Sequence, residues 1–228
     1  MGINADYSFY VVSKVRIRYP LVNSNTSTIS TLIVARNTMN ELQKFIHQFP
    51  VVLPEAALIA FLGIFRQTSL EKYAYFAMEG RIETSFGFVE SGVLRAFYRT
   101  TSGKEYNRAL LETGEFVGAY SALISGQLNH INIQALTPCN IWVADYRQLT
   151  ALFDQHPAIE RLVRHISESY YLFFENRELQ IILHTVEERY EFFKQAHPML
   201  EHLIPQYHIA SYLGITPTQL SRIRAKKL

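Results

Sequence analysis

Cysteine is almost missing from this sequence, since Cys139 is the single one in 228 residues. One cysteine excludes an internal disulfide and argues against a cysteine-ligated zinc ion or iron–sulfur cluster within one chain. No apolar run is long enough for a membrane span. The first residues also lack the charged and apolar segments of a secretion signal. These absences predict a protein of the reducing cytoplasm that has no membrane partner.

Net charge is also small, at +2, so any affinity for nucleic acid must come from a local patch of cations. Apolar side chains, in contrast, are abundant. The hydrophobic fraction is 48% and the charged fraction 18%. These values are typical of soluble globular proteins whose core is stable without disulfide bonds or structural metal ions. The length allows one large domain or two small ones.

The middle of the chain has the pattern of short β-strands. Helical spacing at 39–49 and 53–66 gives way to a period of two between Glu71 and Tyr146, with Gly and Pro signals between the runs. TTSG between LRAFYR and KEYNRALL is typical of a hairpin turn. Residues 39–154 are therefore expected to form a double-stranded β-helix, that is, a jelly-roll or cupin-like β-roll, in an α+β protein.

Residues 1–38 differ from the rest, because a strand-like run is followed by the polar segment NSNTSTIST. Two interpretations stay open. The segment is either a poorly packed extension that comes from a wrongly assigned start, or an added strand on a sheet edge. Proteolysis would distinguish them, since a packed strand resists cleavage.

A long amphipathic helix is predicted at 155–184. Its apolar residues follow steps of four and three, as in a coiled-coil seam: Ile159, Val163, Ile166, Tyr170 and Phe173. Such a stripe packs either on its own domain or on a second copy of the chain. The length and the aromatic content favour a homodimer.

The C-terminal segment 185–228 has the pattern of a helix-turn-helix. Thr185 and Glu188 form a capping-box signature at its start. Further on, a short helix with small Ala210 is followed by Gly214, which permits a turn with positive φ. Thr216 is then expected to cap a second helix that has Pro217 in its first position.

The second helix has the composition of a DNA-reading element. Its outward residues are polar or basic, and its end carries four cations and no acid. Taken alone, a charge run is usually a solvated face, but this turn pattern favours DNA binding. We expect Thr218, Gln219 and Arg222 to read base edges and the others to hold phosphates; the predicted contacts are Thr216, Thr218, Gln219, Ser221, Arg222, Arg224, Lys226 and Lys227.

The order of β-roll, long helix and helix-turn-helix resembles the Crp/Fnr family of transcription regulators. FVESGVLRAFYRTTSGKEYNRALLETGEFVG is similar to the sensor core of that family. PQYHIASYLGITPTQLSRIRAKKL is similar to a Bacteroidetes branch that lacks the C-terminal wing. The resemblance implies a dimer that binds double-stranded DNA, with RNA polymerase as a further partner. It also implies an operator different from that of the best-known members, which carry Arg-Glu where this chain has Pro217 and Thr218.

Cyclic-nucleotide-binding members of that family carry a Glu for the ribose and an Arg for the cyclic phosphate in one loop. The matching positions here are Ala119 and Asn129. Losing two charge-assisted bonds of about 1.5–3 kcal/mol each makes cyclic AMP an improbable ligand. Either the loop is a retained scaffold, or a different molecule binds there; the candidate residues are Gly114, Glu115, Gly118, Ala119, Tyr120, Gln127, Asn129 and His130.

Other kinds of site find little support in the sequence. The histidines other than His130 are scattered and are interpreted as surface or capping residues. No nucleophile elbow appears, and no cofactor or enzyme activity is predicted. The expected function is that of a dimeric DNA-binding regulator whose β-roll senses an unknown signal. The alternative is a ligand-binding β-roll with a vestigial DNA-binding module; a cupin-like enzyme is disfavoured because a metal-ligand cluster is lacking.

Overall fold

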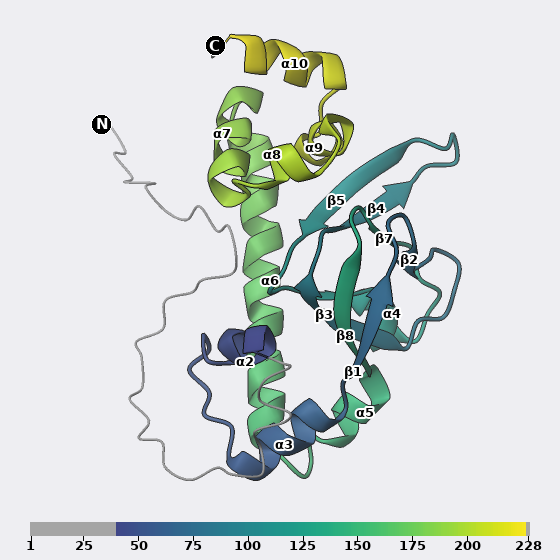
Figure 1. Cartoon of the computed structure of the whole chain (residues 1–228), viewed down its shortest axis with the longest axis vertical. Helices are drawn as coiled ribbons and strands as arrows, with labels where there is room; N and C mark the ends of the chain where they lie inside the picture. Colours follow the sequence, from purple (N-terminus) through teal and green to yellow (C-terminus); the bar gives the residue numbers. More distant parts are fainter. Residues whose placement is uncertain (1–39, 227–228) are drawn as a thin grey trace.

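The structure is a computed structural model that describes residues 40–226. The predicted extension at 1–38 and the predicted phosphate contact Lys227 lie outside the described residues. Within this range the chain forms two short helices, a β-roll, a long helix and a terminal group of helices (Figure 1). The α+β class and this order of elements are as the sequence predicts.

The β-roll consists of two four-stranded antiparallel sheets with the orders β1-β8-β3-β6 and β2-β7-β4-β5. Helix α4 (Tyr120–Ser125) lies between β6 and β7 in sequence. The strands are β1 (Arg66–Leu70), β2 (Tyr75–Ala77), β3 (Ser85–Ser91), β4 (Leu94–Arg99), β5 (Glu105–Leu111), β6 (Phe116–Gly118), β7 (Asn132–Ala135) and β8 (Cys139–Asp145).

The first sheet buries both of its faces, which explains why β8 is almost continuously apolar. Ile141 and Val143 pack between the two sheets. Trp142 and Ala144, which alternate with them, pack on the opposite face, against α2 (Asn40–Ile46), α3 (Glu55–Gly63) and the start of the long helix. The first sheet thus lies between the second sheet and a layer of helices.

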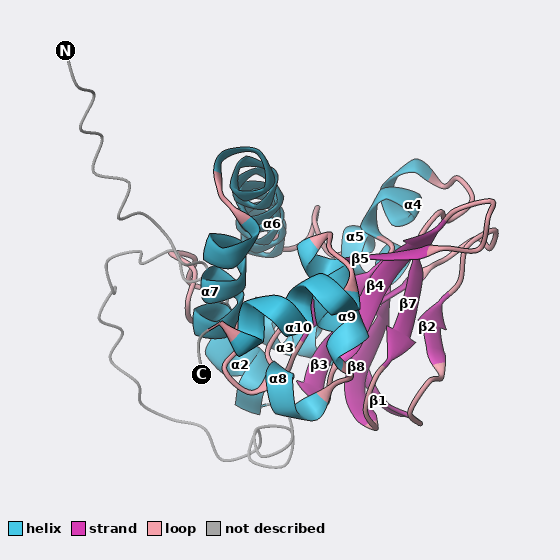
Figure 2. Cartoon of the chain, turned by 90° about the horizontal axis from the view of Figure 1, so that it is seen from above, coloured by secondary structure: helices cyan, strands magenta, loops and turns pink. Residues whose placement is uncertain are grey.

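Helix α6 (Pro157–Leu183) runs the length of the molecule beside the β-roll and connects its two ends (Figure 1). Near its start lie α3 and α5 (Tyr146–Ala151). Beyond its end the chain turns back through α7 (Val186–Ala196), α8 (Leu200–Leu203), α9 (Gln206–Leu213) and α10 (Pro217–Ala225). Seen from above, α9 of this terminal group lies beside β5 of the second sheet (Figure 2).

Several predicted elements are confirmed, and one boundary is wrong. The hairpin turn joins β4 to β5, and α6 matches the predicted long helix closely. The helix predicted at 53–66, however, ends at Gly63, and Arg66 already begins β1, which pairs with β8. The apolar spacing of LGIFR is compatible with a helix or with a strand. Hydrogen bonding to β8 makes the segment from Arg66 a strand.

The apolar stripe assigned to a dimer seam faces the chain's own β-roll instead. Ile159 is fully buried in the core with α3, and Val163 and Ile166 pack against the same cluster. The Tyr170 hydroxyl donates to the Phe116 carbonyl at 3.1 Å and accepts from its N–H at 3.0 Å. Phe173 lines a hollow between α6, α7 and α9. Most of this stripe therefore packs within the chain itself, and its assignment to a dimer seam stays a prediction.

A different face of α6 is open. Leu172, Leu179 and Leu183 are 43%, 45% and 68% exposed. Steps of seven and four keep them on one side of a helix, about half a turn from the side of Val163 and Tyr170. The exposed side is therefore the one available to a partner.

Candidate nucleic-acid interface and ligand cavity

Helices α9 and α10 form the two arms of the predicted helix-turn-helix. Gly214 ends α9 in the left-handed region with φ of 74°, where a side chain would add strain. Thr216 then caps α10 in a capping box, in which its hydroxyl accepts from Gln219 N–H. Leu220 and Ile223 point inward and are 1% and 6% exposed. Both helices are thus fixed by their own sequence and packed on one small core.

The outward face of α10 carries the predicted DNA contacts. Those within the described residues are all exposed: Thr216, Thr218, Gln219, Ser221, Arg222, Arg224 and Lys226. Thr218 and Arg222 are four residues apart and share one side of the helix. Figure 1 shows α10 at the tip of the terminal group, on the far side of α7 and α9 from the β-roll. A duplex can therefore reach this face without displacing the β-roll.

Gln219 has a structural role that the sequence interpretation missed. Its amide oxygen accepts from Thr216 N–H at 2.9 Å and from the Thr216 hydroxyl at 3.0 Å. Reading adenine needs both the oxygen and the NH₂ of the amide. Gln219 would have to leave the cap to read a base in that way, which makes Thr218 and Arg222 the stronger candidates for base contacts.

Two of the predicted phosphate contacts have weak partners in the chain itself. Arg224 Nε lies 3.7 Å from Glu201 Oε1, and Lys226 Nζ lies 3.9 Å from Glu187 Oε1. The lysine pair is exposed on both sides, and exposed pairs contribute about 0–1 kcal/mol; Glu201 is 17% exposed but already accepts from the Tyr190 hydroxyl. A phosphate can therefore replace either carboxylate at little cost. The Arg222 side chain makes no hydrogen bond or ion pair within residues 40–226, so its guanidinium is available.

The terminal helices dock on the β-roll through α9. Asn107 of β5 donates its backbone N–H to the Ser211 hydroxyl at 2.9 Å and its amide NH₂ to the His208 carbonyl at 2.9 Å. Leu110 of β5 belongs to the same apolar cluster as Ile209 and Leu213. Position and orientation of the helix-turn-helix are therefore set by contacts with the β-roll as well as by α6.

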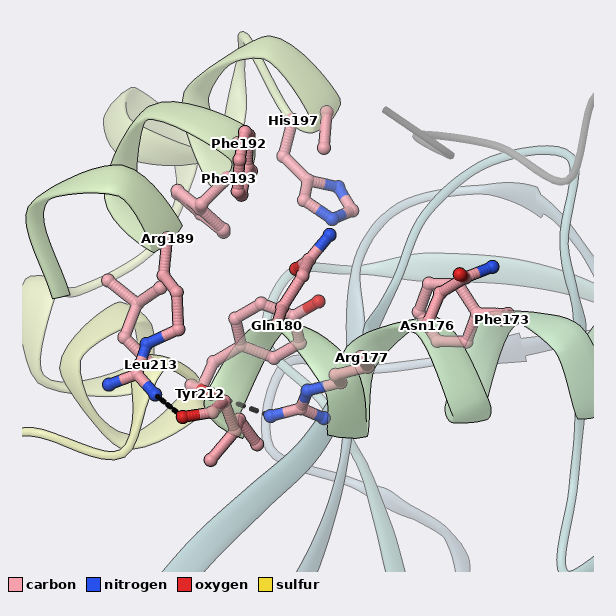
Figure 3. A pocket seen from close by; sticks show the side chains of 12 residues that line it. Phe173, Asn176, Arg177, Gln180, Arg189, Phe192, Phe193, His197, Tyr212 and Leu213 are labelled. Carbon is pink, nitrogen blue, oxygen red and sulfur yellow. Dashed lines mark hydrogen bonds between the residues drawn. The ribbon is translucent and has the colours of Figure 1, made fainter. Parts of the chain in front are cut away.

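A small hollow of about 50 Å³ remains between α6, α7 and α9 (Figure 3). Arg177 reaches from α6 across it and donates to the Tyr212 carbonyl at 2.6 Å. Burial lowers the pKa of Arg177, and its guanidinium stacks 4.0 Å from the centre of the Tyr212 ring. The hollow is too small for more than a water molecule or two at about 30 Å³ each. The Arg177 contact with Tyr212 beside it connects α6 to the terminal helices.

Two histidines at this interface are buried, although the sequence suggests surface or capping positions; of the two, His197 does occupy the C-cap of α7. His197 and His208 are 6% and 3% exposed. His197 Nδ1 lies 2.6 Å from Glu112 Oε2 at the end of β5. Both are buried because the terminal helices pack on the β-roll and cover them. This packing depends on residues far away in the sequence, so the residues next to each histidine do not indicate its burial.

Burial, together with the charge of Arg95, lowers the pKa of His208 to about 4, although Glu105 acts in the opposite direction. The unfolded chain takes up a proton near pH 6.5, whereas the folded chain resists it until about pH 4. Stability should therefore fall as the pH falls, by about 2 kcal/mol between pH 7.5 and 5. Urea unfolding at several pH values measures this.

The matched variants separate His208 from the other titrating groups. His208→Gln should flatten the pH dependence in that window, whereas replacement of the exposed His47 with Gln should leave it unchanged. An equal slope in the wild type and in His208→Gln would contradict the assignment.

The β-roll holds a cavity of about 460 Å³ that the sequence did not reveal. Its walls come from β5, β6, α4 and the interior of the roll, and one side is α6 from Val163 to Phe174. The lining is dominated by aromatic and aliphatic side chains, with a single arginine, Arg108. Tyr120, Ile124 and Tyr171 line it and are 42%, 60% and 66% exposed, so the opening lies between α4 and α6.

Only part of the predicted ligand loop reaches this cavity. Gly118, Ala119 and Tyr120 line it, whereas Gly114, Glu115, Gln127, Asn129 and His130 do not. Asn129 is buried, and its side chain is committed to the backbone of Met78 and Ile131 through bonds of 2.6–3.0 Å. Both amide hydrogens of Asn129 are thus already used and His130 is exposed, so the role of these two residues in binding a ligand stays a prediction.

Residues 67–156 match the family model of the cyclic nucleotide-binding domain. FixK2 from Bradyrhizobium japonicum is 16% identical, with a TM-score of 0.64 over 72% of this chain and 84% of that one. A protein assigned to the Crp/Fnr family from Eubacterium rectale is 13% identical, with a TM-score of 0.60 over 76% and 83%. CooA from Carboxydothermus hydrogenoformans, as a mutant, is 19% identical, with a TM-score of 0.56 over 88% and 85%.

The fold is thus that of a cyclic nucleotide-binding-like β-roll joined by a long helix to a terminal helical domain. The resemblance to a solved Crp/Fnr-family protein is confirmed for the fold, and the likeness to a branch without a wing stays a prediction. A search of curated proteins finds no match. Between residues 40 and 226, no helix has both the length and the apolar character required to cross a bilayer. The same residues include no group of three His, Cys, Asp or Glu that could hold a metal ion.

Proposed function

We propose that the chain is a dimeric, sequence-specific DNA-binding regulator of transcription, and not an enzyme. The observation that carries the proposal is the exposed polar and basic face of α10 on a capped helix-turn-helix. The likeness in fold to a solved protein assigned to the Crp/Fnr family supports it. A regulator bound beside a promoter would also contact RNA polymerase.

In the proposed complex, α10 lies in the major groove. Arg222 reads a guanine through its two parallel donors, and Thr218 contacts the neighbouring base edge. Ser221, Arg224, Lys226 and Lys227 hold phosphates. Two copies would present their α10 helices to half-sites about one helical turn apart.

The proposed dimer uses the open face of α6, which replaces the stripe predicted from sequence. Leu172, Leu179 and Leu183 offer a row of exposed apolar side chains at coiled-coil spacing. A second copy of the same helix is the occupant that such a self-complementary row fits best, because a two-fold axis brings each leucine against its counterpart.

Cyclic AMP is not the proposed signal of the β-roll. Ala119 offers no acceptor for a ribose hydroxyl, and its neighbour in the family pattern, Asn129, is committed to backbone hydrogen bonds. A bound signal would act on α6, since the Tyr120 hydroxyl lies 2.9 Å from the Ser167 hydroxyl across the opening of the cavity. It must favour the DNA-binding arrangement over the other to have an effect.

Replacing Arg222 or Lys226 with Ala tests the two kinds of DNA contact. Arg222→Ala should relax preference at one base pair of each half-site, with a loss of about 1–3 kcal/mol for the best sequence. Lys226→Ala should weaken all sequences alike. Binding to a randomised duplex pool, sequenced before and after selection, measures both effects.

The reverse pattern, in which Lys226→Ala alters base preference and Arg222→Ala does not, would contradict the contact assignment. Arg66→Ala, a change of an exposed arginine on β1, serves as the control and should alter neither quantity.

A further inference from the structure

The cavity of the β-roll has the chemistry of a site for an apolar organic acid. The 24 residues that line it include no Asp, Glu, Lys or His, and one Arg. Its volume of about 460 Å³ corresponds to roughly fifteen water molecules at about 30 Å³ each. A space of that size with apolar walls and a few polar groups is typical of small-molecule sites.

Arg108 is the feature that selects an anion. Its guanidinium stacks over the Phe174 ring, 4.0 Å from the ring centre, and both residues line the cavity. Its remaining contact is a long hydrogen bond of 3.4 Å to the Tyr98 hydroxyl. Within residues 40–226 no carboxylate lies within ion-pair distance of it. An arginine in an apolar wall without a counter-ion matches a carboxylate, which accepts two parallel N–H bonds.

The shape of the cavity separates the charged end from the apolar end. Val163 to Phe174 form one wall, which spans about 16 Å of helix at 1.5 Å per residue. Arg108 marks the Phe174 end of this wall. Toward the other end lie Val163 and Ile166, with Leu149 and Phe61 from α5 and α3. A ligand would place its acid at Arg108 and extend an apolar body toward the start of α6.

Cyclic nucleotides do not suit these walls. The sugar hydroxyls of a nucleotide need buried polar partners, and the polar side chains in the lining besides Arg108 are serines and tyrosines. Of these, Tyr120 already pairs with Ser167, and Tyr170 pairs with the Phe116 backbone. Burial and the charge of Glu115 raise the pKa of Tyr170, so it stays a neutral hydroxyl.

We propose that the β-roll binds an apolar monocarboxylic acid, acyl or aromatic, with the carboxylate on the Arg108 guanidinium. The proposal extends the sensor role given above to the β-roll. It is tested on the free protein without DNA, so failure of DNA binding and failure of ligand binding are separate outcomes.

Calorimetric titration of the full chain tests the proposal with four probes: decanoate, 2-naphthoate, decanol and cyclic AMP. At least one acid should bind at one molecule per chain with micromolar affinity, and which of the two acids binds tells an acyl from an aromatic ligand. Decanol lacks the charge, so if decanoate binds, decanol should bind about tenfold more weakly or worse, because one charge-assisted pair is lost. Cyclic AMP should give no micromolar isotherm.

Variants locate the site. Arg108→Gln should weaken binding of the preferred acid about tenfold. The near-ultraviolet circular dichroism of the variant protein should match that of the wild type. Arg66→Gln removes an exposed arginine elsewhere on the roll and should change nothing. Binding of neither acid, equal affinity of decanoate and decanol, an Arg108→Gln protein that binds the acid as tightly as wild type, or micromolar binding of cyclic AMP would each overturn the proposal. If Arg108→Gln fails to fold, the proposal is tested with Arg108→Lys instead. The affinities of the wild type for decanoate and decanol provide a second test that needs no variant.

Discussion

The affinity of the dimer for its operator should fall about a thousandfold when the salt concentration rises from 50 to 200 mM. Three cations of the α10 end, Arg224, Lys226 and Lys227, are assigned to phosphates in each of two copies, which gives about six contacts and a logarithmic slope near −5. The carboxylates that neighbour Arg224 and Lys226 are 3.7 and 3.9 Å away and do not hold them firmly. Fluorescence anisotropy with a labelled operator at five salt concentrations measures the slope.

A variant with one fewer cation provides the internal check. Lys226→Ala removes one contact from each copy and should make the slope shallower by about 2. Arg66→Ala, on the β-roll, should leave it unchanged. A slope near zero for the wild type would mean that the cations of α10 do not meet phosphates.

Leu179→Glu should weaken self-association of the chain by at least about a hundredfold, which is roughly 3 kcal/mol. In the proposed dimer, each copy places this side chain in the apolar row of α6, and two carboxylates would then face one another without partners. Leu183→Glu should have a similar effect. Sedimentation equilibrium over a range of protein concentrations measures the dissociation constant.

The control is a matching change at an exposed apolar residue away from α6. Ile82 is 67% exposed in the loop before β3, and Ile82→Glu should leave the dimer intact. Because Leu179 is already 45% exposed, its replacement should cost the monomer little stability. A dimer that survives both α6 changes would show that another surface holds the copies together.

Much of the fold could be predicted because local rules and tertiary structure agree. Gly214, Thr216 and Pro217 each occupy the backbone position that its chemistry favours, so the turn of the helix-turn-helix was visible from sequence. The capping box at Thr185 likewise marks the start of α7. The boundary at Gly63 was missed because β1 is fixed by pairing with β8, and pairing leaves no local pattern.

The site was predicted less completely, and the reason is physical. A periodic stripe shows which side of α6 is buried and does not show what buries it. Val163 and Ile166 were therefore assigned to a second copy although they pack on the β-roll. Arg108 and Phe174 lie far apart in sequence and meet only when β5 and α6 are assembled. The cavity itself is a property of several elements together, so its chemistry became visible only in the structure.

The central claim is that two copies of the chain read DNA through α10. Its most direct test is selection of bound fragments from the genomic DNA of the source organism with the purified full chain, in parallel with Arg222→Ala. The wild type should recover fragments that share a pseudo-palindrome with half-sites about one helical turn apart, and Arg222→Ala should lose the common base at one position of each half-site. Recovered fragments without any shared sequence, or no retained DNA at low salt, would contradict the claim.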